Sequence, residues 1–199
     1  MIGLFQGVGA APVSTLGAAD CEAIAQGFLA QPVAAVSSLA FIGAAGWLSR
    51  RRPASGTERA AAGVYAGLVA LVGAGSVAYH GPQGPAAQVL HDAPIVLVLA
   101  MGAAVPVLRA ARGRAPFAPH AGTPARIAGA ALVAGLTAYA LGRTGSPACD
   151  PTSLVQPHAA WHALMAVALG AWGAALWEPN PSPASADPSA EVVASGQAS

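Results

Sequence analysis

Residues 60–109 read AAAGVYAGLVALVGAGSVAYHGPQGPAAQVLHDAPIVLVLAMGAAVPVLR. This stretch contains two long apolar runs, 60–80 and 87–109, separated only by the turn-like sequence His80-Gly-Pro-Gln-Gly-Pro85. A helix needs roughly 20 mainly apolar residues to cross a bilayer, and both runs reach that length. The stretch therefore predicts two successive membrane-spanning helices.

Three further apolar runs are long enough to span a membrane, at about 31–49, 125–143 and 157–177. The composition agrees, because 55% of the 199 residues are hydrophobic and only 9% are charged, whereas soluble domains carry about a quarter charged residues. The sequence predicts an all-α, polytopic transmembrane helix bundle with five spans. A net charge of +1 argues against nucleic acid as a partner.

Eight of the nine arginines lie in or beside two of the loops between these runs. Arg50, Arg51, Arg52 and Arg59 follow the first run, and Arg109, Arg112, Arg114 and Arg126 follow the third. Since cytoplasmic loops are enriched in basic residues, we expect the N-terminus outside and the C-terminus inside. An apolar start without a basic n-region predicts no cleavable signal peptide, and this start together with the exclusive use of Arg fits a bacterial inner membrane.

The chain divides into three parts on this interpretation. Residues 1–30 form an outer N-terminal segment, and 31–177 form the transmembrane domain. Residues 178–199 are rich in Pro, Ser and Ala and predict a disordered cytoplasmic tail, because they cannot bury enough apolar surface to fold.

The chain has two cysteines, Cys21 and Cys149. The predicted topology places both on the outer side, just before the first span and just before the last. An oxidising outer compartment allows them to form a disulfide, and the alternative is two unrelated free thiols.

Ionisable residues gather at the outer ends of three spans. His80 ends the second run, His91 and Asp92 begin the third, and His158 and His162 begin the fifth. Such residues cost about 2.5–3.5 kcal/mol each at the centre of a membrane helix and usually mark function. Their common level in the membrane predicts a shared site.

The spacing favours a metal site. His158 and His162 are four residues apart and share one helix face, as do Ser76 and His80. Three imidazoles and one water form a catalytic zinc site, in which zinc lowers the pKa of the water to about 7. A carboxylate such as Asp92 can accept the proton, and a hydroxyl such as that of Ser76 can donate to an oxyanion.

Each residue taken singly has a simpler interpretation. His80 can interact with a helix C-terminus, Asp92 can cap a helix start, and Ser76 can bond to its own helix backbone. The coincidence of all of them at one level on three helices favours the metal site. His91 points elsewhere on its helix than Asp92, which favours an interfacial or supporting role.

These motifs resemble those of the alkaline ceramidases and of the wider superfamily that includes the adiponectin and progestin receptors. Gly75-Ser-Val-Ala-Tyr-His80 is similar to a Ser-x-x-x-His motif, and Gln88-Val-Leu-His-Asp92-Ala-Pro-Ile to a Gln-x-x-Asp-x-x-Pro segment. Gln156-Pro-His158-Ala-Ala-Trp-His162 is similar to the closing His-x-x-Trp-His motif. Cys21-Glu22 and the segment from Gln31 to Ser38 resemble the entrance segment, and the motifs occur in the family's order.

The resemblance implies that zinc is held by His80, His158 and His162, with Asp92 and Ser76 as the catalytic pair. It implies hydrolysis of an amide bond in a membrane lipid, with ceramide as the type substrate, and a disulfide between Cys21 and Cys149. Family members have seven spans, whereas five are counted here. The family's calcium site is acid-rich, and only Asp20 and Glu22 remain here, so Ca²⁺ is less supported than Zn²⁺.

The sequence thus predicts a zinc-dependent intramembrane hydrolase of a ceramide-like lipid amide. The alternative is a non-catalytic membrane receptor or sensor of the same superfamily with a structural zinc. A haem or copper protein with paired histidines is a third interpretation, which a Soret band would reveal for haem.

Overall fold

The computed structural model describes residues 16–51, 53 and 56–177. Two predictions concern residues outside these ranges: the disordered tail at 178–199 and the absence of a cleavable signal peptide at the start of the chain. The described helices are α1 (Pro32–Ser37), α2 (Leu39–Arg50), α3 (Gly56–His80), α4 (Ala87–Ala111), α5 (Gly122–Leu141) and α6 (Pro157–Leu176). Within the described residues there is no β-strand beyond one isolated bridge.

The predicted count of five is confirmed for the described residues, which hold five candidate membrane spans when α1 and α2 are counted as one, Pro32–Arg50. All five are long and apolar enough to cross a membrane. The predicted runs agree with the helices to within a few residues at each end. Which side of the membrane each end faces remains the prediction that the arginines make.

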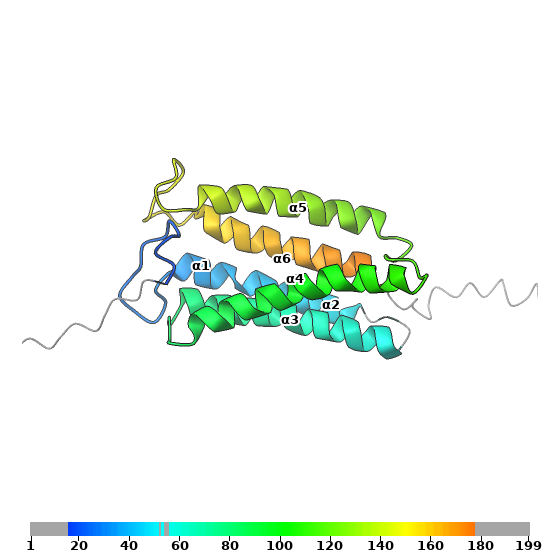
Figure 1. Cartoon of the computed structure of the whole chain (residues 1–199). Helices are drawn as coiled ribbons and strands as arrows, with labels where there is room; N and C mark the ends of the chain where they lie inside the picture. The colour runs from blue at the N-terminus through cyan, green and yellow to red at the C-terminus, as the bar shows by residue number, and fades with distance from the viewer. Residues whose placement is uncertain (1–15, 52, 54–55, 178–199) are drawn as a thin grey trace, which may run out of the picture.

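Helix α6 forms the centre of the bundle (Figure 1) and contacts every other described helix. Its most apolar stretch is 61% buried, whereas the corresponding stretches of α4 and α5 are each 17% buried. A helix that is apolar all round is expected in such a central position. The apolar side chains on the outer faces, such as Val64, Val96 and Val133, suit contact with lipid.

Residues 16–31 fold over one end of the bundle (Figure 1) and are fixed there covalently. Cys21 and Cys149 form the predicted disulfide, with Cα atoms 5.4 Å apart. An isolated antiparallel bridge pairs Asp20 with Arg143, and the Cys21 N–H donates to the carbonyl of Gly142 at 2.8 Å. Residues from the first part of the chain are thereby held against the α5–α6 connection.

Two glycines allow backbones to approach closely at the same end. A Cβ at Gly75 would overlap the backbone carbonyl of Leu90, so α3 and α4 meet here without an intervening side chain. A Cβ at Gly142 would lie 2.6 Å from the backbone nitrogen of His158. Close backbone contact through small residues is typical of membrane helices, and here it brings together the helix ends that carry the polar residues.

Candidate metal centre

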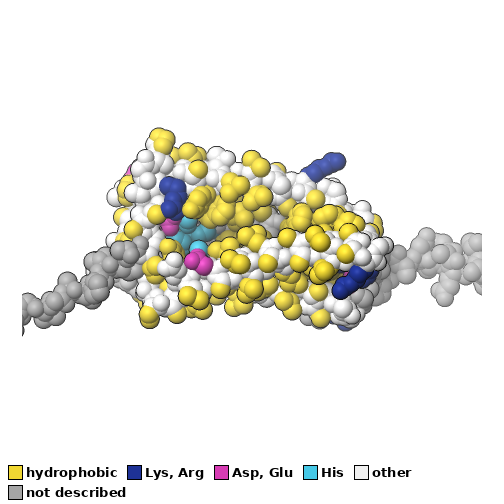
Figure 2. All heavy atoms as spheres, viewed as in Figure 1, with side chains coloured by type: hydrophobic (Ala, Val, Ile, Leu, Met, Phe, Trp, Pro, Cys, Tyr) yellow, Lys and Arg dark blue, Asp and Glu magenta, His cyan; other side chains and the backbone are white. Residues whose placement is uncertain are grey.

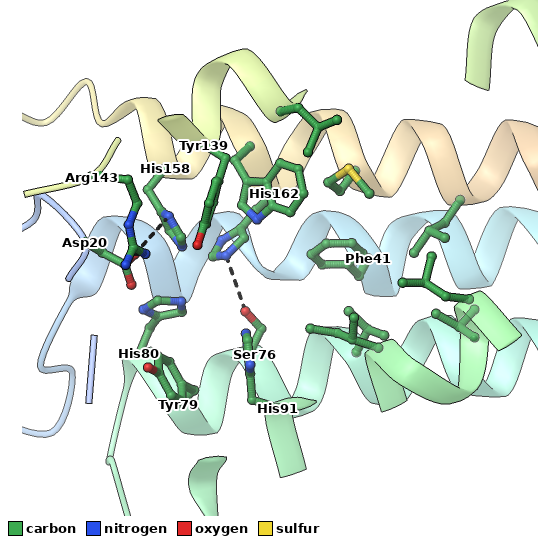
Figure 3. A pocket seen from close by; sticks show the side chains of 18 residues that line it. Asp20, Phe41, Ser76, Tyr79, His80, His91, Tyr139, Arg143, His158 and His162 are labelled. Carbon is green, nitrogen blue, oxygen red and sulfur yellow. Dashed lines mark hydrogen bonds and ion pairs between the residues drawn. The ribbon is translucent and has the colours of Figure 1, made fainter. Parts of the chain in front are cut away.

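Three buried imidazoles converge at the end of the bundle that carries the disulfide (Figure 3). His80 comes from the last turn of α3, and His158 and His162 come from the first two turns of α6. One nitrogen of each ring lies within 4.8 Å of one nitrogen of each of the others. All three residues are at most 5% exposed. The predicted metal-ligand set is therefore assembled in space.

The surroundings of His162 determine which of its nitrogens carries the proton. Its Nδ1 lies 3.1 Å from the carbonyl oxygen of Ala34 and 2.9 Å from Ser37 Oγ. The single hydroxyl proton of Ser37 goes to the same Ala34 carbonyl, and that of Ser38 is shared between this carbonyl and Ser76 Oγ. Neither serine then has a proton left for the imidazole, so Nδ1–H is the donor. The unprotonated Nε2 is left free to bind a metal.

Gln31 determines which nitrogen of His80 carries the proton. The Gln31 side-chain amide donates to the carbonyls of Gly17, at 3.0 Å, and Glu22, at 2.9 Å. Its oxygen is thereby turned toward His80, whose Nδ1 lies 2.7 Å away. Since the amide oxygen can only accept, His80 Nδ1–H is the donor. Gln31 is 0% exposed, and His80 Nε2 has no hydrogen-bond partner.

His158 lies beside a buried carboxylate. Its Nδ1 is 3.4 Å from Asp20 Oδ1, an ion-pair distance without hydrogen-bond geometry, and neither ring nitrogen has a hydrogen-bond partner. Arg143 donates to the same Asp20 oxygen at 2.7 Å. Burial is the largest influence on the Asp20 carboxyl and raises its pKa, against the lowering effect of the Arg143 guanidinium.

The donor set fits a divalent transition metal. Neutral imidazoles are zinc ligands, and three of them with one open position are typical of catalytic sites. Buried polar atoms without partners cost about 1–3 kcal/mol each, and His80 and His158 together present three such nitrogens. A bound cation would satisfy one nitrogen of each ring. Hydrogen bonds that orient the ligand rings from behind, as Gln31 and Ala34 provide here, are also typical of metal sites.

Ser76 is the hydroxyl that the structure places inside this cluster. Its Oγ lies 3.5 Å from His162 Nε2, the nitrogen left free for a metal, and 2.9 Å from Ser38 Oγ. Ser76 is 1% exposed, and it lies one helical turn before His80 on the same face. The predicted proximity of Ser76 to the metal ligands is therefore present in the fold.

The structure does not bring Asp92 into the cluster of His80, His158 and His162. The Asp92 side chain is 56% exposed and bonds to His91 Nδ1 at 2.7 Å. His91 instead turns toward the pocket (Figure 3), where its ring stacks on that of Tyr79 with centroids 4.5 Å apart. Successive residues point about 100° apart around a helix, so only one of the two can face the site. The catalytic role of Asp92 stays a prediction that this geometry does not support.

The two acidic residues that the resemblance assigns to a calcium site have other partners here. The Glu22 carboxylate accepts the backbone N–H groups of Val33, at 2.7 Å, and Ala34, at 2.8 Å, and so caps α1. Asp20 is paired with Arg143. Both carboxylates therefore have partners within the protein and are not directed together at one position where a calcium ion could bind.

The histidines lie at the polar end of a pocket of about 450 Å³. Figure 2 shows the histidine side chains in a hollow of the surface, with hydrophobic side chains along its continuation. The walls are mainly apolar, with Phe41, Val72, Ile95, Leu99, Leu136, Trp161 and Met165 among them. Tyr139, Asp20 and Arg143 line the pocket near His158 (Figure 3).

Four residues near the site were not assigned this role from the sequence. The sequence indicated Asp20 only as a remaining acid of a calcium site and Gln31 only as part of the entrance segment, and it indicated no role for Tyr139 or Arg143. An intramembrane Tyr followed four residues later by Arg, at the outer end of the fourth span, was the available signal, since helical residues at this spacing share a face.

Paired substitutions test which carboxylate, that of Asp20 or that of Asp92, supports metal binding. We expect Asp20→Asn to weaken zinc binding about 10–100-fold, as loss of a group behind a metal ligand does, because it weakens the contact with His158 and leaves Arg143 without its ion pair. Asp92→Asn should leave zinc affinity unchanged. Competitive titration with a fluorescent chelator measures both. Loss of zinc in Asp92→Asn alone would place Asp92, rather than Asp20, beside the ion.

No protein-family model, curated protein or solved structure matches the chain. The relation to the ceramidase superfamily therefore stays an expectation that rests on the sequence motifs.

Proposed function

We propose that the protein is a zinc-dependent intramembrane hydrolase that cleaves the amide bond of a membrane lipid. The observation that carries the proposal is the convergence of three buried imidazoles at the polar end of an apolar pocket, two of them with nitrogens that have no hydrogen-bond partner. Three neutral nitrogen ligands leave an open coordination position, which is typical of catalytic rather than structural zinc.

The chemistry divides between the metal and the side chains around it. Bound zinc would lower the pKa of a water ligand to about 7 and polarise a carbonyl. Ser76 would donate a hydrogen bond to the carbonyl oxygen as negative charge develops on it, a role supported by its position 3.5 Å from His162 Nε2. Hydrolysis consumes one water: its oxygen joins the acyl carbon, the carbon–nitrogen bond breaks, and the amine leaves with a proton.

Two features support a lipid as the substrate. The pocket wall is formed by apolar side chains of α2 to α6, and it lies in a bundle whose helices are suited to crossing a membrane. Polar groups are confined to the histidine end, where a headgroup and its scissile bond would bind. The choice of an amide over an ester rests on the resemblance to ceramidases.

Ser76→Ala is the variant that tests catalysis separately from metal binding. We expect it to retain zinc while turnover of a long-chain lipid amide falls about 10²–10³-fold, the usual effect of removing one oxyanion donor. Purified protein in detergent is assayed against ceramides and simple N-acyl amides by mass spectrometry of the released fatty acid. Ser49→Ala, in α2 and outside the pocket, is the matched control.

The same assay distinguishes the hydrolase from the receptor. A protein that binds zinc but releases no fatty acid from any amide or ester offered would contradict the hydrolase and favour a sensor with structural zinc. Full activity in Ser76→Ala would show that another group stabilises the oxyanion.

A further inference from the structure

Helices α4 and α5 follow each other in the chain but do not pack against each other along the bundle. Each packs instead on a different neighbour, α4 on α3 and α5 on α6, and no contact between α4 and α5 occurs among the described helices. The space between them holds a second cavity of about 320 Å³. Because both helices are candidate membrane spans, this cavity opens sideways toward the hydrocarbon of the bilayer.

The second cavity continues the metal-site pocket. Val98 and Leu99 of α4 and Met165 and Leu169 of α6 line both. The remaining lining residues are apolar, small or aromatic, and α5 contributes Ala125, Ala128, Gly129 and Leu132. No charged side chain is among them. The two cavities form one path, which we call the α4–α5 groove, from the histidines along α6.

Trp172 closes the far end of the groove. Its indole N–H donates to the backbone carbonyl of Gly102 at 3.1 Å, which joins α6 to α4 across the path. Phe117 packs edge-on against the same indole, with ring centroids 5.4 Å apart. The ring packs closely on Gly102: a Cβ added at Gly102 would lie only 3.1 Å from the indole nitrogen.

We propose that the α4–α5 groove holds one unbranched acyl chain of the substrate, which enters sideways from the membrane and ends at Trp172. This inference rests on the proposed hydrolase function and specifies its substrate. His162 and Trp172 are ten residues apart on α6, or about 15 Å at 1.5 Å per residue. Since each C–C bond of about 1.5 Å advances an extended chain by somewhat less than its length, the groove holds roughly twelve carbons.

The size of the groove selects this occupant over a helix from another chain. A helix is at least about 10 Å across with its side chains, so a 15 Å length of it occupies roughly 1,000 Å³ or more. The two cavities that form the groove, of about 450 Å³ and 320 Å³, together fall short of that volume. An acyl chain is thin enough to fit, and its carbonyl end would then lie at the histidines.

Gly129 provides a substitution that fills the groove without disturbing the protein. A Cβ at Gly129 has no atom within 4 Å, although the residue lines the cavity. Gly135, six residues further along α5, packs against Trp161 and Leu164, so Gly129 lies nearer the Trp172 end of the groove. Gly67 of α3 also has open space at its Cβ and does not line the groove, which makes Gly67→Leu the matched control.

The test compares N-acyl amides of 6 to 16 carbons with wild type, Gly129→Leu and Gly67→Leu in the same detergent. In Gly129→Leu we expect kcat/KM for the 12-carbon amide to fall about tenfold or more, as overpacking an apolar site does, while the value for the 6-carbon amide stays within about twofold. Gly67→Leu should match wild type. An equal response of both lengths to Gly129→Leu would overturn the proposal.

A readout independent of turnover uses an N-acyl amide with a photoreactive diazirine at the end of a 12-carbon chain. Irradiation of the full chain should label peptides that contain residues 125–132 or 102–103, and Gly129→Leu should remove this labelling. Labelling without hydrolysis would reject the proposed function but keep the groove. Hydrolysis with labelling elsewhere, or a cross-link between two protein copies through α4 and α5, would reject the groove.

Discussion

Purified wild-type protein is expected to contain about one zinc per chain, and the His158→Ala/His162→Ala variant is expected to contain none. The double substitution leaves His80 as the only imidazole of the cluster, and a single neutral ligand cannot hold the ion against dilution and dialysis. Elemental analysis of detergent-purified protein measures the stoichiometry directly. His120→Ala is the control, because His120 is an exposed loop residue outside the cluster.

Loss of the metal should also lower stability. A ligand that binds only the folded state adds about 2.7 kcal/mol when its concentration is 100 times its Kd, so chelation should reduce the Tm of wild type and leave that of the double variant unchanged. Wild type without bound metal, even after incubation with zinc, would mean that the three histidines are only buried polar residues. The hydrolase proposal would then be abandoned.

Gln31→Leu is expected to have the second largest effect, on both metal affinity and folding. The substitution removes the acceptor that holds His80 in the tautomer with a free Nε2, and it removes the two donors to the carbonyls of Gly17 and Glu22. Groups behind metal ligands contribute about 10–100-fold in affinity, and each buried carbonyl left unpaired costs about 1–3 kcal/mol. Zinc titration and thermal unfolding measure the two effects.

Gln31→Glu separates the two roles of this side chain. A carboxylate keeps the acceptor for His80 but cannot donate to the two carbonyls, so zinc affinity should recover toward wild type while the Tm stays low. Gln26→Leu, at an exposed position of the same segment, is the control for the loss of an amide. Equal zinc affinity in Gln31→Leu and wild type would show that His80 needs no positioning, and that Gln31 has only a structural role.

Much of this protein follows from the sequence because the membrane imposes simple rules. A spanning helix must satisfy its backbone internally and present apolar side chains, so the five runs predicted the five helices within a few residues. Histidines at the ends of three apolar runs had few alternatives to a shared site. Two of the three candidate metal ligands, His158 and His162, share a helix face by spacing alone, and the disulfide partners were the only two cysteines.

The tertiary structure alone decided how each helix is turned and what covers the site. The sequence placed His91 and Asp92 at the same depth in the membrane as the other histidines. The rotation of α4, however, directs His91 into the pocket and leaves Asp92 exposed. Asp20 and Gln31 reach the histidines only because residues 16–31 fold over the bundle. The groove between α4 and α5 exists because α4 packs on α3 and α5 packs on α6. Periodicity and hydropathy describe single helices, whereas these features depend on contacts between segments far apart in the chain.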